Sequence, residues 1–496
     1  MERSTRIQVY VLCLIVAGSI MTVGYQAYAS GCYTKFIFNW FSANNVLSCL
    51  DGASSPIIGN LTSIQSCDYN IMQASTGNPR NIIAVDCKTA TVAYQSTNAS
   101  SVFNSVMTSI NNKNGGVVHI TGYTSTHAYN ITTAIILPDS GRLELQGDGS
   151  WFTTLKIPTG SDNDMFKFVG SKSVDSFFNY FHDFNMEGND GSGGVSNTGF
   201  NFSATTHGMH DSRFDNLFIE HFKKYDVYIT TPNSWNMMFT NDVFELAGDY
   251  CFYHQGGSDT RIVDSKFLFC KGVYALYLGG GLNTVQASWF YQNEKNAILL
   301  ANSPNVINAN KFYDNGLSAS NTYHDIALSS SVANVITSNT FSGSDLTNKT
   351  KDAIFISDNV SYNNTIVGNN FASTGSTSFG TRPITGFHNK GVNTITNNAM
   401  WNPQGKVTSF IDNSGAYFVS AGGTTGTLTN NTLYQISDSN VFIISTGGTG
   451  VKITLFDNQG NTLQANLATL NQQFMPLGYK IKFIWTTIPT VTVYFQ

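Results

Sequence analysis

The sequence has few charged residues, and this scarcity excludes several classes of protein. Of its 496 residues, 11% are charged, whereas 41% are hydrophobic and 13% are aromatic. Disordered chains combine few hydrophobic residues with high net charge, so this chain is expected to fold. Its net charge of −5 comes from thinly spread groups, and no basic stripe is present. Nucleic acid is therefore not expected as a partner.

The sequence also lacks the motifs that identify common catalytic and cofactor sites. None of its cysteines forms a CxxC pair, which disfavours a zinc site. The glycine-rich segment 188–194 is followed by no lysine and has no strand–loop–helix context, so it is not a phosphate-binding loop. His182, His210, His221 and His254 lack metal-ligand spacing and are interpreted as surface or turn residues. The sequence therefore predicts no cofactor, with calcium as an alternative for one column of turn residues.

Residues 1–29 have the pattern of an export signal. Charged residues precede an apolar stretch over residues 7–24, and Ala27-Tyr28-Ala29 supplies a small-x-small cleavage site. The apolar stretch is also nearly long enough to span a bilayer, so a retained N-terminal membrane anchor is the alternative. In both cases the rest of the chain is predicted to be secreted, or to lie on a cell or virion surface.

The cysteines and the glycosylation sequons agree with that destination. Outside the export signal the number of cysteines is even, which favours disulfides in an exported chain. The first four are predicted to pair among themselves and to staple an N-terminal region, residues 30–99. A bond between the last two stays open, because their spacing differs from the repeat length. The six are Cys32, Cys49, Cys67, Cys87, Cys251 and Cys270. The predicted glycosylation sites are Asn60, Asn98, Asn130, Asn201, Asn348, Asn359, Asn363 and Asn430.

An internal repeat is the strongest structural signal in the sequence. Its core has the pattern apolar-x-x-polar-x-Phe, with Met replacing Phe at both ends of the series. The successive copies end at Met186, Phe214, Phe244, Phe267, Phe290, Phe312, Phe341, Phe371 and Met400. A second alternating strand follows many copies after a variable gap, as near Val227 and Leu276. Stacked coils with projecting loops are therefore predicted, and the Phe side chains are expected to form one buried stack.

Two columns of polar residues are predicted to lie in the turns between these strands. Two positions before the repeat Phe or Met, the later coils carry Asn310, Asn339, Asn369 and Asn398. Their amides are expected to hydrogen-bond to one another along the axis. Three positions before it lie Asp183, Asp211 and Asp264, with Asn241 in the same column. This second column is interpreted first as turn residues and second as a cation site.

A helix is expected around Val102–Asn112, followed by GGVVHI at Gly115–Ile120 and by two apolar segments that end at Pro158. This order resembles the opening of pectate-lyase-superfamily chains, which include viral tailspikes. In that superfamily a helix caps the coil before the first rungs. The resemblance implies a right-handed parallel β-helix over residues 100–402. It implies no single activity, because the fold hosts lyases, hydrolases, epimerases and adhesins.

The repeat ends after Trp401-Asn402-Pro403. Short alternating strands separated by Gly and Asn turns occupy residues 403–496 and predict a small β-sandwich or jelly-roll domain. The expected fold class is thus all-β, a parallel β-helix followed by this domain. The domain is interpreted as a cap or a means of self-association, with glycan or receptor binding as the alternative. By analogy with β-helical spikes, a homotrimer is expected.

Three tyrosines occupy one outward column of the second strand on consecutive coils: Tyr228, Tyr253 and Tyr277. Flat rings with a polar tip suit the faces of sugars, so this column is predicted to bind a glycan unless loops bury it. Glycoside hydrolysis needs two carboxyls, one protonated and one ionised. The candidate catalytic acids of the same coils are Asp226, Glu245, Asp249 and Glu294. For each of these acids, the alternative to catalysis is an ordinary solvated surface residue.

Three functions agree with these features. The first is an exported surface or virion spike that binds a cell-surface polysaccharide and can cleave it. The second is a non-enzymatic structural or adhesive protein of an envelope or virion, and the third is a free secreted polysaccharide lyase or glycoside hydrolase. The superfamily-like opening and the additional C-terminal domain favour the spike. Because the polygalacturonase motifs are absent, the sequence decides neither whether a bond is broken nor which glycan is bound.

Overall fold

The structure is a computed structural model of the whole chain. It describes residues 67–373, apart from 75–80, 123–127, 171–174, 190–196, 205, 303, 344–349 and 359, together with shorter stretches between 384 and 495. Several predictions fall outside these residues: the export signal, Cys32, Cys49, and the sequons at Asn60, Asn348, Asn359 and Asn430. Of the helices in the described part, none is both long and apolar enough to cross a membrane.

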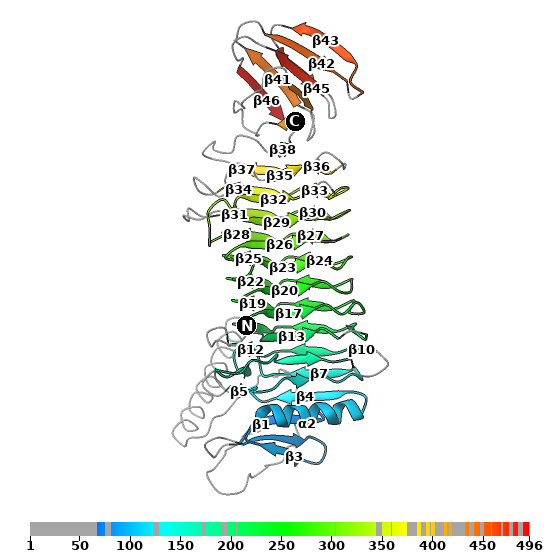
Figure 1. Ribbon diagram of the computed structural model, residues 1–496, viewed down its shortest axis with the longest axis vertical. Helices are drawn as coiled ribbons and strands as arrows, with labels where there is room; N and C mark the ends of the chain where they lie inside the picture. The colour runs from blue at the N-terminus through cyan, green and yellow to red at the C-terminus, as the bar shows by residue number, and fades with distance from the viewer. Residues whose placement is uncertain are drawn as a thin grey trace, which may run out of the picture.

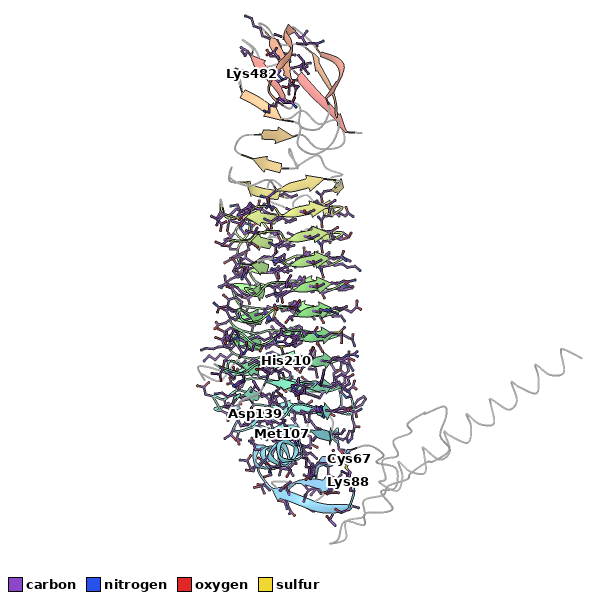
Figure 2. All side chains as sticks on the ribbon, turned by 90° about the vertical axis from the view of Figure 1, so that its right-hand side faces the viewer. Cys67, Lys88, Met107, Asp139, His210 and Lys482 are labelled. Atoms are coloured by element: carbon purple, nitrogen blue, oxygen red, sulfur yellow. A yellow bond between two sulfur atoms is a disulfide. The ribbon has the colours of Figure 1, made fainter. Side chains whose placement is uncertain are left out.

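A helix and a small antiparallel arrangement cover the N-terminal end of the molecule (Figure 1). Strands β1 (Tyr69–Gln73), β2 (Ile82–Asp86) and β3 (Thr91–Ser96) pair in antiparallel fashion, and β1 continues in parallel with β4. The helix α2 (Ala99–Asn112) buries Val102, Phe103, Val106, Met107 and Ile110 on one face. This spacing is that of an amphipathic helix, and Met107 marks it beside the first coils in Figure 2. The expected cap is present.

The body of the chain is a solenoid of three parallel sheets, which we name A, B and C in the order in which each coil visits them (Figure 1). Sheet A continues from β1 through β4 (Gly116–Ile120), β7 (Leu143–Gln146), β11 (Tyr180–His182), β15 (Arg213–Asp215), β18 (Met238–Thr240), β21 (Arg261–Val263), β24 (Thr284–Gln286), β27 (Val306–Asn308), β30 (Val335–Thr337), β33 (Thr365–Val367) and β36 (Thr394–Thr396). Sheet B contains β5 (Tyr129–Asn130), β8 (Thr154–Lys156), β12 (Asn185–Glu187), β16 (Phe218–Glu220), β19 (Val243–Glu245), β22 (Lys266–Leu268), β25 (Trp289–Tyr291), β28 (Lys311–Tyr313), β31 (Thr340–Gly343), β34 (Asn370–Ser373) and β37 (Ala399–Trp401).

Sheet C completes each coil. It contains β6 (Ile135–Ile136), β9 (Phe166–Phe168), β13 (Thr198–Phe202), β17 (Tyr225–Ile229), β20 (Tyr250–His254), β23 (Tyr274–Leu278), β26 (Asn296–Leu300), β29 (His324–Leu328), β32 (Asp352–Ile356), β35 (Ile384–Phe387) and β38 (Ile411–Asn413), with β39 (Ala416–Phe418) antiparallel at its end. A short pair, β10 (Ser176–Phe177) and β14 (Met209–His210), lies outside these sheets. The chain is a right-handed parallel β-helix, as the resemblance implied.

The predicted stack of aromatic rings is present, with one correction. Successive rings from Phe244 to Phe371 on sheet B lie parallel, with centroids 4.6 to 4.9 Å apart, and all are buried. Phe214 does not belong to this stack, because it lies on sheet A and stacks on Phe239 at 4.3 Å. Ile219 takes the expected place, paired with Phe244. The copy ending at Phe214 was assigned one strand too early.

The turns explain that error. Asp183, Asn241 and Asp264 have positive φ in the corner between sheets A and B, as expected for turn residues. Asp211 also has positive φ, but it precedes the sheet A strand β15, in a different corner. Both corners therefore place an Asp or Asn in the left-handed conformation just before a strand. Their sequences look alike, and the pattern could not separate them.

The predicted asparagine ladder is confirmed. Asn310 donates from Nδ2 to Oδ1 of Asn339 at 3.0 Å, and Asn339 donates likewise to Asn369 at 2.9 Å. A second ladder, which was not predicted, lies in the corner before sheet A. Its members are Asn283, Asn305, Asn334, Asn364 and Asn393. Most of these amides are buried, and they satisfy one another's hydrogen bonds along the axis.

Two disulfides are present among the described residues. Cys67–Cys87 joins the segments at the start of the chain's described part, with Cα atoms 5.8 Å apart. Cys251–Cys270, the bond that the spacing left open, links β20 to the segment after β22, with Cα atoms 5.9 Å apart. It joins two neighbouring coils at the corner between sheets B and C. At this corner the two cysteines meet although they are separated by fewer residues than one full coil.

Two small antiparallel sheets lie beyond the solenoid, at the end opposite α2 (Figure 1). One contains β40 (Thr432–Gln435), β45 (Lys480–Ile484), β42 (Lys452–Phe456) and β43 (Thr462–Leu467). The other contains β44 (Leu470–Met475), β41 (Val441–Thr446) and β46 (Thr490–Phe495). Their antiparallel pairing agrees with the small β domain expected after the repeat.

Candidate functional site

Three consecutive strands of sheet C carry the pattern Tyr-x-x-Tyr: β17, β20 and β23. Their third and fifth residues are fully buried and form the core, as Val227 and Ile229 do on β17. The fourth residue therefore points outward, because side chains alternate along a strand. The parallel register places Tyr228 beside Tyr253, and Tyr253 beside Tyr277.

The predicted tyrosine column is a continuous stack. The rings of Tyr228 and Tyr253 have centroids 5.4 Å apart with an interplanar angle of 24°, and those of Tyr253 and Tyr277 are 4.5 Å apart at 13°. All three side chains are half-buried. The rings are thus stacked face to face on their neighbours and remain partly exposed, so the alternative of a stripe buried under loops does not apply.

Three further tyrosines begin the same strands, and the sequence analysis did not include them. Tyr225 stacks on Tyr228 at 4.5 Å, and Tyr250 contacts Tyr253 at 5.1 Å. Tyr274 occupies the same position on β23. We call the six residues Tyr225, Tyr228, Tyr250, Tyr253, Tyr274 and Tyr277 the tyrosine face. The recurring Tyr-x-x-Tyr could have revealed them, but alternation alone assigns the first position to the inside.

The hydroxyls of Tyr225 and Tyr253 are neutral over the physiological pH range. Burial, followed by the nearby charge of Asp249, raises the pKa of Tyr225 to about 12. Burial and the neighbouring hydroxyls raise the pKa of Tyr253 further. The Tyr253 hydroxyl donates a hydrogen bond to Oε1 of Gln255 at 2.7 Å. The face therefore offers rings with uncharged donors and acceptors, which suits a ligand rich in hydroxyls.

The structure corrects the placement of Asp226. This residue was expected beside the tyrosines on the outer face, but it is fully buried, and neither carboxyl oxygen makes a hydrogen bond. Burial raises its pKa well above the usual range, and the charges of Glu220 and Glu245 raise it further. It occupies the second position of β17, where its neighbours on later coils are Cys251 and Ala275. Asp226 therefore cannot touch a surface ligand.

The other three candidate acids do not form one group. Asp249 is exposed, and it lies close enough to Tyr225 and Tyr250 for its charge to raise the pKa of both hydroxyls. Glu294 lies in the turn before β26, one coil beyond the last tyrosine strand. Glu245 lies on the outer face of sheet B rather than sheet C. Only Asp249 adjoins the tyrosine face.

Glu245 has a partner that the sequence analysis missed. Glu220 sits directly beside it in the parallel register of β16 and β19, and both side chains are partly buried. Burial, followed by the charge of Glu220, raises the pKa of Glu245. Burial also raises the pKa of Glu220, which accepts a hydrogen bond from Asn185 at 3.2 Å. We call Glu220 and Glu245 the acid pair. Because the charge of Glu220 raises the pKa of Glu245, an ionised Glu220 favours a protonated Glu245.

Among the described residues, no group of three or more His, Cys, Asp or Glu side chains gathers closely enough to hold a metal ion. The column that offered a calcium alternative divides between two corners, since Asp211 is separate from Asp183 and Asp264. His254 is buried and bonded to Thr260 at 3.0 Å, and burial lowers its pKa to about 4. The turn residues and His254 therefore have structural roles.

A family model described as "Periplasmic copper-binding protein (NosD)" matches residues 215–435, which is less than half of the chain. The matched region contains no described cluster suited to copper, and its two cysteines are joined in a disulfide. Among the described residues of this region, the side chains thus do not fit a copper site. No curated protein matches the sequence.

Several solved structures are similar in fold. ORF18 of Geobacillus virus E2 is 15% identical with a TM-score of 0.48, covering 76% of this chain and 74% of that one. The tailspike of E. coli bacteriophage HK620 is 10% identical with a TM-score of 0.48, covering 79% and 88%. A DFA-IIIase from Arthrobacter chlorophenolicus A6 is 14% identical with a TM-score of 0.48, covering 63% and 87%. The β-helix assignment rests on the sheet register of this chain.

Proposed function

We propose that the tyrosine face binds a polysaccharide that lies along the axis of the β-helix. The observation that carries this proposal is the series of three Tyr-x-x-Tyr strands on consecutive coils, which gathers six tyrosines on one outer surface. Neighbouring coils are about 4.8 Å apart, so the outward rings form a regular ladder. A repeating polymer matches a repeating surface, because each unit meets the same chemistry as the last.

The binding energy would come mainly from ring contacts. Each tyrosine that contacts a sugar ring with its exposed surface contributes about 1 kcal/mol beyond simple burial. The neutral hydroxyls add hydrogen bonds with the hydroxyls of the sugar, and the exposed Asp249 adds one acceptor at the edge. Several weak contacts in series are the usual way in which a flat surface holds a long polymer.

Cleavage, if the chain performs it, is assigned by this proposal to the acid pair. Adjacent strands hold the backbones of Glu220 and Glu245 about 4.8 Å apart, so their carboxyls can reach the separation of about 5 Å that retaining glycosidases have between their two carboxyl groups. Their raised pKa values favour one protonated carboxyl and one carboxylate, which are the acid and the nucleophile of that mechanism. Neither Asp226 nor Asp249 has such a partner on the outer surface.

The proposed setting is the surface of a cell or virion, or the medium outside a cell. The two disulfides support it, because such bonds persist in oxidising compartments. Among the sequons of the described residues, Asn98, Asn130 and Asn363 are exposed, whereas Asn201 is half-buried and bonded to Asp164. The homotrimer stays a prediction, which light scattering on the full chain can test.

The binding proposal is tested with a glycan array and two variants of the full chain. Tyr253→Ala removes the central ring, and Tyr362→Ala removes an exposed tyrosine that lies on another part of the coil. We expect Tyr253→Ala to weaken binding to the glycan that the wild-type protein selects, whereas Tyr362→Ala keeps it. Equal binding by the wild-type and Tyr253→Ala proteins would place the glycan site elsewhere.

The cleavage proposal has a separate test. Release of reducing sugar from the selected glycan is measured for the wild-type protein and for Glu220→Gln and Glu245→Gln. Each variant should lose release while keeping its affinity for the array glycan, because the tyrosine face is intact. Binding without any release in the wild-type protein would identify a non-enzymatic adhesive protein.

A further inference from the structure

Sheet B presents a second outer surface, and its side chains follow two columns. Phe267, Phe290 and Phe312 point into the core, so the residues on either side of each one point outward. The first column reads Lys266, Trp289 and Lys311 along β22, β25 and β28. The second column reads Leu268, Tyr291 and Tyr313. Two coil spacings separate the first and last members, roughly 10 Å.

The tryptophan of this surface is unusually open. Trp289 is 46% exposed, although it lies in the middle of a continuous sheet. The ammonium of Lys311 lies 4.6 Å from its ring centroid, a cation–π contact. Beside it, the rings of Tyr291 and Tyr313 stack at 5.5 Å with an interplanar angle of 11°. An exposed aromatic surface is therefore bordered by positive charge.

The two lysines have no acidic partner among the described residues. Both are exposed, and no carboxylate of the described residues lies within ion-pair distance of either ammonium. The earlier coils of the same sheet differ. There Lys156 pairs with Glu187, and Glu187, Glu220 and Glu245 follow one another in register. The outer face of sheet B thus changes from negative to positive within a few coils.

We infer that Lys266, Trp289, Lys311, Tyr291 and Tyr313 form a binding site for an anionic sugar, with a ring stacked on the aromatic surface and its carboxylate held by the lysines. We call these five residues the lysine–tryptophan patch. Exposed cations on both sides of one ring suit a ligand that has a flat face and a negative group. A neutral sugar would use the ring alone and leave both ammonium groups unused.

A second copy of this chain is a poor occupant, since two such patches facing each other would bring four ammonium groups together. Nor does the site depend on the tyrosine face, which lies on sheet C and carries no cation among its six residues. The two surfaces share the coil of β22 and β23, but one presents only tyrosines and the other combines aromatic rings with lysines.

The test compares two forms of one ligand by calorimetry on the full chain. The probe is a short hyaluronan oligosaccharide, and its partner is the same oligosaccharide with its carboxylates converted to methyl esters. The ester keeps the sugar rings and loses the charge. The wild-type protein should prefer the acid form by roughly tenfold, and added salt should reduce this preference.

Matched variants separate the roles of ring and charge. Trp289→Ala should weaken the acid form roughly tenfold, whereas Trp235→Ala, which removes another exposed tryptophan, should leave it unchanged. The double variant Lys266→Gln with Lys311→Gln should abolish the preference for acid over ester. Lys452→Gln, which changes another exposed lysine, should keep that preference. Circular dichroism and thermal unfolding show that each variant is folded.

Three results would overturn the inference. The first is equal affinity of the wild-type protein for the acid and ester forms, or no binding of either. The second is a folded Trp289→Ala protein that binds the acid form as the wild-type protein does. The third is self-association of the wild-type protein that Trp289→Ala abolishes, since the patch would then be an interface between copies. Loss of array binding in Tyr253→Ala bears on the tyrosine face alone.

Discussion

The outer faces of sheets B and C differ sharply although they enclose the same core. On sheet C, three successive strands present tyrosines, and the hydroxyls of Tyr225 and Tyr253 are held neutral. On sheet B, five successive strands from β16 to β28 run from the acid pair to the lysine–tryptophan patch. Inward residues are repetitive because they pack on identical neighbours above and below. Outward residues meet only solvent, so each face can carry its own chemistry.

This comparison implies that a change in the core should affect both faces, whereas a change on one face should leave the other intact. The largest effect is expected at Phe290, which is fully buried between Phe267 and Phe312. Phe290→Ala should lower the free energy of unfolding by about 3–5 kcal/mol, because it leaves a cavity in the stack. Chemical denaturation measures the loss, and Phe178→Ala, at a 60% exposed ring, serves as the control.

A buried acid of sheet C should make the stability depend on pH. Burial raises the pKa of Asp325 to about 8, against a usual value of 3.8. The folded state therefore holds this proton more tightly than the unfolded chain does. Its contribution to stability is complete below pH 4 and is lost as pH rises toward 8, a change of a few kcal/mol.

The variant Asp325→Asn should remove that part of the pH dependence while keeping an acceptor for Asn315, whose Nδ2 lies 2.8 Å from Asp325. Denaturation curves at several pH values, for the wild-type and variant proteins, provide the measurement. Asp226 and Asp242 have pKa values raised in the same direction, so the difference between the two proteins isolates Asp325. Parallel pH profiles for the two proteins would contradict the assignment.

The independence of the two faces can be tested by exchanging ligands between variants. Tyr253→Ala should weaken binding of the array-selected glycan by several-fold, corresponding to about 1 kcal/mol, and leave hyaluronan binding unchanged. Trp289→Ala should show the opposite pattern. In the double variant the two losses should add, because distant sites without shared partners are independent. Coupling between them would mean that one ligand covers both faces.

The smallest effect is expected at the acid pair. Burial raises the pKa values of both carboxyls, and the charge of Glu220 raises that of Glu245 further, so stability is lost as pH rises through their folded pKa values. Glu245→Gln removes one of the two charges and should make the protein slightly more stable than the wild type at neutral pH. Below the titration of both carboxyls the two proteins should be equally stable, which thermal unfolding at acid and neutral pH can show.

Much of the coil could be predicted from residues alone, and the errors were local. The stack from Phe244 to Phe371 and the ladder from Asn310 to Asn369 were foreseen, because each repeats at a fixed place in every coil. Phe214 was misplaced, because two corners of the coil use the same left-handed turn before a strand. A repeat identifies the period but does not say which corner a short motif occupies.

The candidate site was predicted less completely. The column of Tyr228, Tyr253 and Tyr277 followed from alternation, whereas Tyr225, Tyr250 and Tyr274 did not, because strand parity assigns them to the inside. Only one member of the acid pair, Glu245, was among the candidates. Glu220 was not recognised as its neighbour on the adjacent strand. Asp226 was expected on the surface and is in the core.

The sequence by itself determined that this chain coils, which residues line its core, and that tyrosines recur on one outer column. Those features are periodic, and periodicity is visible in one dimension. Only the tertiary structure decided which side chains from different coils become neighbours, as Glu220 and Glu245 do, or Lys266, Trp289 and Lys311. The reason is that coil lengths vary, so the register between parallel strands is set by packing in the core and by the turns, and outward residues inherit their neighbours from it.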